Sequence, residues 1–294
     1  MKYTAILFLL LSILIDLKAA ETVISGTDSS YVGVELVFLK YSDPISGSES
    51  VMDRTVVKSD GSFDLRFEID EVTYVFAYLG VYRVHLYAEP GRQYQIVFPP
   101  REDKEPGDLL NPYFSPVIIH LATISYERDE INTLIRMFDD AFMPFYNKHI
   151  LDVFEKDDFS ELDENIVQME RPFAKSKNSY FNNYRLYKYG LLRHLAYQQR
   201  SRYISDEYFK GKPVLLNNTS YMELFNQVYE KYFHYFSRTE EGKQLGSAIR
   251  SQQFDSLRQV VASDRVLGSG NLPDLVILKS LHDEFYDDNF SRNA

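Results

Sequence analysis

The spacing of apolar residues changes once along this 294-residue chain, near residue 100. Before that point apolar and polar residues alternate, which is typical of strands with one buried face. The clearest run, from Phe63 to Ile69, follows the turn pair Asp60-Gly61. The other runs lie near residues 22–25, 32–40, 51–57, 72–79, 82–88 and 94–98. About seven short strands at regular spacing predict an antiparallel β-sandwich over residues 21–100.

Residues 101–115, which are rich in proline and in mixed charges, predict a linker. Beyond this segment apolar residues recur every three or four positions, which is the period of a helix. The pattern is clearest over residues 131–142, 180–195, 221–232 and 271–285. The predicted fold class is therefore α+β, with the β-sandwich followed by an all-helical domain over residues 116–294.

Residues that favour helix ends set the boundaries of these helices. Asp129 is a candidate N-cap for the first helix, and Pro144 is expected to end it because proline lacks the backbone N–H. The run Asn217-Asn218-Thr219-Ser220 supplies capping residues for the third helix, and Pro273 stands in the first turn of the last.

The first twenty residues have the pattern of an export signal. Lys2 precedes an apolar run from Ala5 to Ile15, shorter than the ~20 residues that cross a bilayer, and cleavage is expected after Ala19 or Ala20. Charged residues close to that point leave an uncleaved anchor as the alternative. No later segment is long and apolar enough to span a membrane, and no cysteine is present to accept a lipid. We therefore expect a mature chain in the periplasm or outside the cell.

Composition narrows the choice of partners. The formal net charge is −11, with no basic patch, which excludes a typical nucleic-acid-binding protein because phosphates require clustered Lys and Arg. The chain has 23 Tyr and 21 Phe but no Trp. Since each tyrosine combines an apolar ring with a hydroxyl that needs a partner, we expect amphipathic packing surfaces.

The sequence contains few motifs that indicate a catalytic or metal site. Without cysteine there is no disulfide and no thiol redox site, and the six histidines show no HExxH spacing. The serine-nucleophile patterns GxSxG and SxxK are also missing. Asp139-Asp140 is the best carboxylate pair, but neighbouring helical residues point about 100° apart, so we interpret the pair as a solvated helix end. We expect no enzyme activity, metal or cofactor.

One aromatic cluster is a candidate binding surface, because aromatic rings at helical spacing could stack on sugars. The more common interpretation of such a cluster is a packed interface. Its members are Tyr229, Tyr232, Phe233, Tyr235 and Phe236.

Short sequence segments in both halves of the chain are similar to those of one protein family. The layout is similar to the non-catalytic N-terminal half of secreted TlpA-like thiol:disulfide oxidoreductases of the Bacteroidetes type. In that family a thioredoxin-fold domain with a CxxC pair follows, so the resemblance implies such a domain or a protein partner here. No catalytic residue can be transferred. The segments that carry the resemblance are Asp60-Gly61-Ser62-Phe63, Glu89-Pro90-Gly91-Arg92-Gln93-Tyr94, Leu110-Asn111-Pro112-Tyr113-Phe114, Lys212-Pro213-Val214-Leu215, Tyr221-Met222-Glu223-Leu224-Phe225, Leu275-Val276-Ile277-Leu278-Lys279 and Phe285-Tyr286.

Two functions of different classes remain open. The first is a cell-envelope scaffold or interaction module that positions a redox domain or partner. The second is a stand-alone periplasmic glycan- or peptide-binding protein that uses the tyrosine-rich helical face.

The missing cysteine makes a direct prediction about activity. Thiol–disulfide exchange needs a thiolate nucleophile, so the purified chain is expected not to reduce insulin disulfides. The measurement is insulin turbidity in the presence of dithiothreitol, with a heat-denatured sample as control. Turnover above that control contradicts the prediction.

Overall fold

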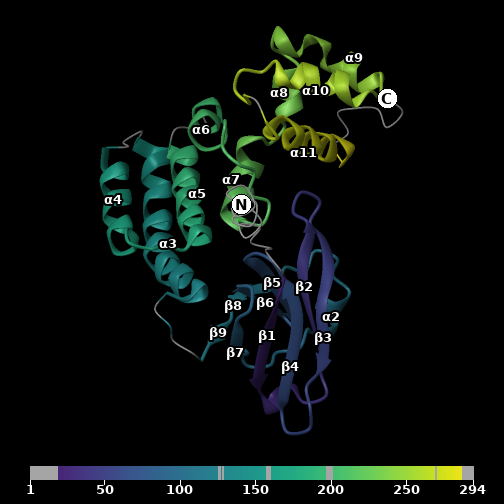
Figure 1. Cartoon of the computed structure of the whole chain (residues 1–294), viewed down its shortest axis with the longest axis vertical. Coiled ribbons are helices and arrows are strands. Elements are labelled where there is room, and N and C mark those ends of the chain that lie inside the picture. The colour runs from purple at the N-terminus through teal and green to yellow at the C-terminus, as the bar shows by residue number, and fades with distance from the viewer. Residues whose placement is uncertain are drawn as a thin grey trace, which may run out of the picture. The chain divides into compact units, whose positions relative to one another are not determined.

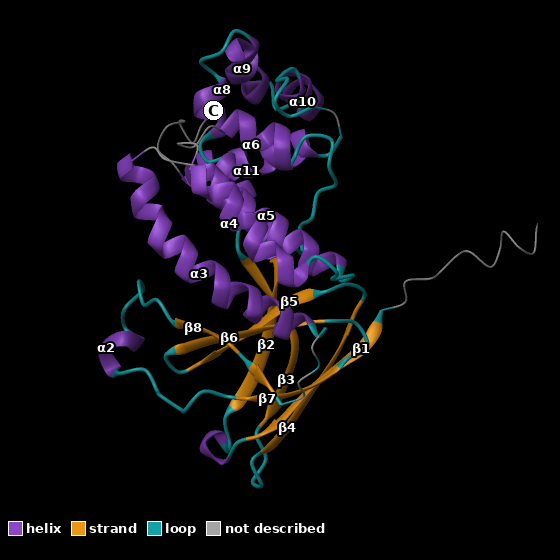
Figure 2. Cartoon of the chain, turned by 90° about the vertical axis from the view of Figure 1, so that its left-hand side faces the viewer, coloured by secondary structure: helices purple, strands orange, loops and turns teal. Residues whose placement is uncertain are grey.

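The computed structural model describes residues 19–124, 127, 129–156, 160–196, 201–268 and 270–286, without the side chains of 148–156 and 160–161. The chain forms two compact units (Figures 1 and 2). The first contains the chain up to Lys40 and Ser50–Tyr126, and the second contains Tyr41–Glu49 and the chain from Glu127. The α+β class is confirmed. The predicted export signal, apart from Ala19 and Ala20, lies outside the described residues.

The described strands form two sheets in the first unit, and the seven predicted strand positions are confirmed. One sheet has the order β4-β1-β7-β9 and the other β3-β2-β5-β6-β8. The strands are β1 (Ala20–Thr27), β2 (Glu35–Asp43), β3 (Ser48–Val56), β4 (Ser62–Ile69), β5 (Thr73–Leu79), β6 (Tyr82–Ala88), β7 (Gln93–Val97), β8 (Val117–His120) and β9 (Ala122–Thr123).

The strand directions correct the prediction of a purely antiparallel arrangement. β1 pairs antiparallel with β4 but parallel with β7, where Ile24 lies opposite Tyr94. β6 pairs antiparallel with β5 but parallel with β8, where His85 lies opposite His120. Both sheets are therefore mixed. Alternation along one strand identifies its buried face and contains no information about the direction of its neighbour.

The segment after residue 100 also differs from its prediction. The predicted linker contains the short helix α2 (Pro106–Leu109). Residues 117–123, which were predicted to be helical, instead add β8 and β9 to the two sheets. Strands this short do not show enough alternation for the sequence pattern to identify them.

The alternating residues of both sheets meet in one buried cluster. Phe63, Leu65 and Phe67 of β4 lie in it as predicted. Phe38 of β2 and Leu86 of β6, from the other sheet, belong to the same cluster and are fully buried. The two sheets therefore share one hydrophobic core.

The described part of the second unit after residue 126 is mainly helical. The predicted helices near 180–195, 221–232 and 271–285 correspond to α5, α7 and α11, although Tyr232 begins the next helix. None of the described helices combines the length and hydropathy needed to cross a membrane. The helices are α3 (Ile131–Lys156), α4 (Ser160–Glu170), α5 (Ser179–Ala196), α6 (Ser201–Tyr208), α7 (Thr219–Val228), α8 (Tyr232–Phe236), α9 (Leu245–Arg250), α10 (Phe254–Ala262) and α11 (Leu272–Tyr286).

The helix ends agree with the sequence in part. Asn218 is the N-cap of α7, and its side chain accepts a hydrogen bond from the Tyr221 N–H at 3.1 Å. At the start of α3 the buried carboxylate of Glu130, and not Asp129, accepts from the N–H groups of the next turn. Pro144 lies inside α3 and does not end it. Proline inside a helix removes one hydrogen bond of the ladder and crowds the carbonyl four residues earlier, which can kink a helix without ending it.

Aromatic rings form much of the core of the second unit. Tyr187 of α5 contacts Tyr221 of α7 edge to face, with ring centroids 4.9 Å apart. Its hydroxyl donates to the carbonyl of Tyr208 at 3.2 Å. Gly190, one turn further along α5, lies where a β-carbon would come within 2.5 Å of Leu224 Cδ2. The close approach of α5 and α7 therefore depends on the lack of a side chain at Gly190.

This packing predicts opposite effects for two helical glycines. Gly190→Ala is expected to destabilise the chain by about 1 to 2 kcal/mol, because overpacking a rigid core outweighs the better helix propensity of alanine. The matched control is Gly246→Ala in α9, where the nearest atom to a new β-carbon is Arg250 Nη1 at 3.6 Å. That control should be neutral or stabilising by up to about 1 kcal/mol. Urea unfolding measures both, and equal effects would contradict the packing.

Candidate functional site

The structure does not bring the five predicted aromatic residues to one surface. Tyr229, Phe233 and Phe236 are buried in the core of the helical unit, and Tyr232 packs against that core. Tyr235 is the one of the five that is largely exposed, at 62%. Most of the candidate surface is therefore core, which is the packed-interface interpretation that the sequence also allowed.

The hydroxyls of the buried tyrosines find partners inside the unit. Tyr229 shares a hydrogen bond of 2.5 Å with the Ser205 hydroxyl, which also donates to the carbonyl of Val266. The Tyr232 hydroxyl donates to Asp264 Oδ2 at 2.8 Å. Burial raises the pKa of both phenols above the ordinary value, and the negative charge of Asp264 raises the pKa of Tyr232 further. These tyrosines are therefore neutral hydrogen-bonding parts of the core, and the sequence alone could not assign their partners.

The last described helix, α11, presents an apolar stripe to solvent. Leu272, Leu275 and Val276 bury the opposite side of the helix in the core. Residues three, four or seven positions apart lie on the same face of a helix. The outward residues, here called the α11 stripe, are Leu278, Leu281 and Phe285, with exposed fractions of 53%, 39% and 65%.

Polar contacts fix α11 in place. Arg258 of α10 binds both carboxylate oxygens of Asp274 in the first turn of α11 and donates to the carbonyl of Gly270. Further along, Lys279 pairs with Asp283 at 2.7 Å, and the Lys279 side chain is only 9% exposed. The α11 stripe is therefore displayed by a helix whose first turn is tied to α10, while the Lys279–Asp283 pair lies within α11 itself.

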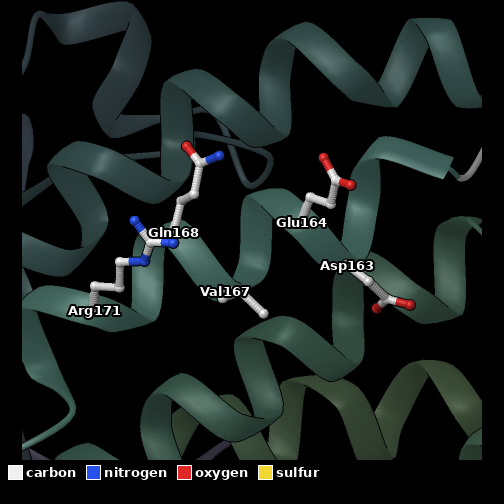
Figure 3. Close-up of a pocket in the computed structure, with 5 residues that line it drawn as sticks. All are labelled: Asp163, Glu164, Val167, Gln168 and Arg171. Atoms are coloured by element: carbon white, nitrogen blue, oxygen red, sulfur yellow. The ribbon is translucent and has the colours of Figure 1, made fainter.

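A pocket lies along α4, as Figure 3 shows. Its lining comes from this helix and from the first residue of the 3₁₀ turn Arg171–Phe173. Asp163 is already engaged, since Arg193 of α5 donates to it at 2.9 Å. Because one continuous stretch supplies the lining, we assign this pocket no function. The lining residues are Asp163, Glu164, Val167, Gln168 and Arg171.

The two neighbouring aspartates of α3 have different surroundings. Asp140 is exposed, as expected for a solvated helix. Asp139 instead faces α5, where the Tyr184 hydroxyl lies 3.0 Å from both of its carboxylate oxygens. Burial raises the pKa of Asp139 to about 6. The interpretation of both residues as solvated was therefore wrong for Asp139.

Two of the scattered histidines meet in the first unit. His85 of β6 and His120 of β8 stack with ring centroids 4.9 Å apart. Burial lowers the pKa of His85 to about 3, and the charges of His120 and Arg83 act in the same direction. No group of three or more metal-ligating side chains occurs among the described residues. The parallel pairing that joins these histidines could not be inferred from their spacing in the sequence.

The chain was compared with protein-family models, with curated proteins and with solved structures, and none of the three comparisons gave a match.

Two tyrosines of α8 allow a direct test of the core assignment. Tyr232→Phe removes the hydrogen bond to Asp264 and leaves that carboxylate without this donor. It is expected to lower the free energy of unfolding by about 1 to 2 kcal/mol. Tyr235→Phe changes an exposed residue and should have an effect below about 0.5 kcal/mol. Chemical denaturation measures both variants, and an equal loss in both would contradict the assignment.

Proposed function

We propose that this chain is a non-catalytic interaction module of the cell envelope that positions a thioredoxin-fold redox domain. The observation that carries the proposal is the α11 stripe. Its three large apolar side chains lie on one helix face and remain in contact with solvent. Full burial of one such side chain contributes about 1.5 to 3 kcal/mol, so a partner that covers the stripe gains binding free energy.

The charges near the stripe indicate the chemistry of the partner. Glu284 precedes Phe285 in α11, and the two residues that follow Tyr286 in the sequence are Asp287 and Asp288. The matching surface is an apolar patch bordered by Lys or Arg, because complementary charges steer and orient association. The choice of a redox domain rests on the resemblance in sequence to the TlpA-like proteins.

The remaining parts of the proposal concern location and architecture. Export by the N-terminal signal would place the module in the periplasm or outside the cell, where such redox proteins act. The shared core of the two sheets supports a β-sandwich in the first unit, which would act as a rigid support.

The glycan- or peptide-binding alternative has less support. It needs a tyrosine-rich helical face that is open to a ligand. Tyr229, Phe233 and Phe236 are each less than 5% exposed, so their rings are not available for stacking.

Photo-crosslinking in cells tests the proposal on the protein as the cell makes it. A photoreactive amino acid replaces Leu278 in the stripe, or Val167 of α4 as a matched exposed apolar control at 57%. We expect the Leu278 position to crosslink to a CxxC-containing thioredoxin-fold domain, identified by mass spectrometry, and the Val167 position not to do so.

Other outcomes of the crosslinking experiment would overturn different parts of the proposal. A partner or a second copy of the chain without CxxC would overturn the redox assignment but retain the interaction module. Equal or no crosslinking at the two positions would overturn the module itself. With a purified partner, Leu281→Asp/Phe285→Asp should weaken binding at least about tenfold, because the double variant places two charges in an apolar contact and tenfold corresponds to only about 1.4 kcal/mol.

A further inference from the structure

A polar cluster joins three helices of the second unit and has no role in the proposed docking surface. Asp139 lies on α3, Tyr184 and Lys188 on α5, and Glu223 on α7. The Tyr184 hydroxyl is 3.0 Å from both oxygens of Asp139, and Lys188 Nζ is 2.7 Å from Glu223 Oε2. Lys188 also lies over the Tyr184 ring, with its Nζ 5.7 Å from the ring centroid. The contacts therefore continue from α3 through α5 to α7.

The charges of this cluster do not balance when both carboxylates are ionised. Lys188 pairs directly with Glu223, and its side chain is only 16% exposed. Its positive charge also acts on Asp139, while the negative charges of Glu223 and Asp140 oppose ionisation there. One proton on Asp139 would neutralise the group formed by Asp139, Lys188 and Glu223.

We propose that Asp139, Lys188 and Glu223 form a proton-operated latch that holds α3 to α5 and α7 more tightly in mildly acidic solution than at neutral pH. Proton uptake removes a partly desolvated negative charge at the α3–α5 contact. The Tyr184 hydroxyl can still donate to the neutral carboxyl group. Release of the proton returns a charge that burial disfavours, which loosens the contact.

The direction of the pH effect follows from the position of Asp139. Burial is the largest influence and raises its pKa to about 6, from an ordinary value of 3.8. A carboxyl group with a raised pKa in the folded state stabilises that state below the unfolded pKa, and this contribution is lost as the pH rises through the folded pKa. The stabilisation is therefore lost between about pH 4 and pH 6, and the proton leaves folded Asp139 around pH 6, which is where the latch opens.

The other described titratable residues on α3 and α4 are exposed or have partners of their own. On α3 itself, Asp140 is exposed, and Tyr146 is influenced by the charge of Glu223. On α4, Asp163 and Glu170 accept hydrogen bonds from Arg193 and Arg185 of α5. Each of these two α4 carboxylates is therefore paired with an arginine of α5 and not with a member of the latch.

Two buried histidines act in the opposite direction over the same pH range. Burial lowers the pKa of both His85 and His194, so the unfolded chain takes up protons first as the pH falls. The pH profile of the wild-type chain alone would mix these effects. The difference between the wild type and an Asp139 variant isolates the latch, because the histidine contributions cancel.

Asp139→Asn mimics the protonated latch at every pH. We expect its Tm to exceed that of the wild type by about 2 to 6 °C at pH 7.5 and by a clearly smaller margin at pH 4.5, because the two proteins converge only below the unfolded pKa of Asp139. Asp140→Asn, at the neighbouring exposed aspartate, is the matched control and should show a much smaller pH-dependent difference, because the charge of Asp140 is the smallest of the influences on Asp139. A Tm difference between Asp139→Asn and the wild type that is the same at both pH values would overturn the latch.

A second measurement reports on the helices themselves. The chain has no cysteine, so Arg136→Cys on α3 and Gln227→Cys on α7, both at exposed positions, give unique sites for spin labels. The distance distribution between the labels should broaden from pH 5 to pH 7.5 in the wild-type background and stay narrow with Asp139→Asn. An unchanged distribution in the wild-type background would overturn the proposal.

If Asp139→Asn does not fold, the variant Tyr184→Phe provides a second test of the latch. It removes the hydroxyl whose hydrogen bond lowers the pKa of Asp139. The pH midpoint of the broadening should then move upward. A midpoint that stays in place would contradict the role of the Asp139–Tyr184 contact.

Discussion

A buried tyrosine ring also takes its hydroxyl out of water, and that hydroxyl must then find a hydrogen-bond partner. The helical unit is built around this constraint. Tyr187 uses a backbone carbonyl, Tyr229 uses Ser205, and Tyr232 uses Asp264. These bonds connect α5 to α6, α6 to the C-terminal end of α7, and α8 to the turn after α10. Many of the aromatic residues that give the sequence its unusual composition are thus committed to the core, and α11 presents three large apolar side chains to solvent on one face.

The sequence predicted the elements better than their connections. Alternation located β4 and β6, and the Asn218 cap located α7, because these signals depend on neighbouring residues only. The parallel pairing of β1 with β7 and of β6 with β8 depends on contacts between distant parts of the chain, so no pattern of neighbouring residues predicts it. The same limit applies to the aromatic cluster. Periodicity placed its rings on helices, but Ser205 and Asp264, which satisfy the hydroxyls, lie in other segments.

Buried charge shows the same dependence on distant partners. Arg185 of α5 is only 5% exposed at its side chain, and it pairs with Glu170 at the end of α4. Tyr189 donates to the other oxygen of Glu170, and the guanidinium lies 4.7 Å from the ring centroid of Phe181. Removing one member would leave a buried charge without its partner, which costs far more than an exposed ion pair. Asp139 differs from this arrangement because no described side chain forms a direct ion pair with it, and its burial therefore favours the neutral form.

The proposed docking function requires both an aromatic core that is closed to solvent and an α11 stripe that is open to it. Hydroxyl-radical footprinting of the native full chain measures both parts in one experiment. Leu281, Phe285 and Tyr235 should oxidise at rates close to those of the urea-unfolded chain, while Tyr229 and Phe233 should be strongly protected. Protection of the stripe residues to the level of the core, or oxidation of Tyr229 as fast as Tyr235, would contradict the account.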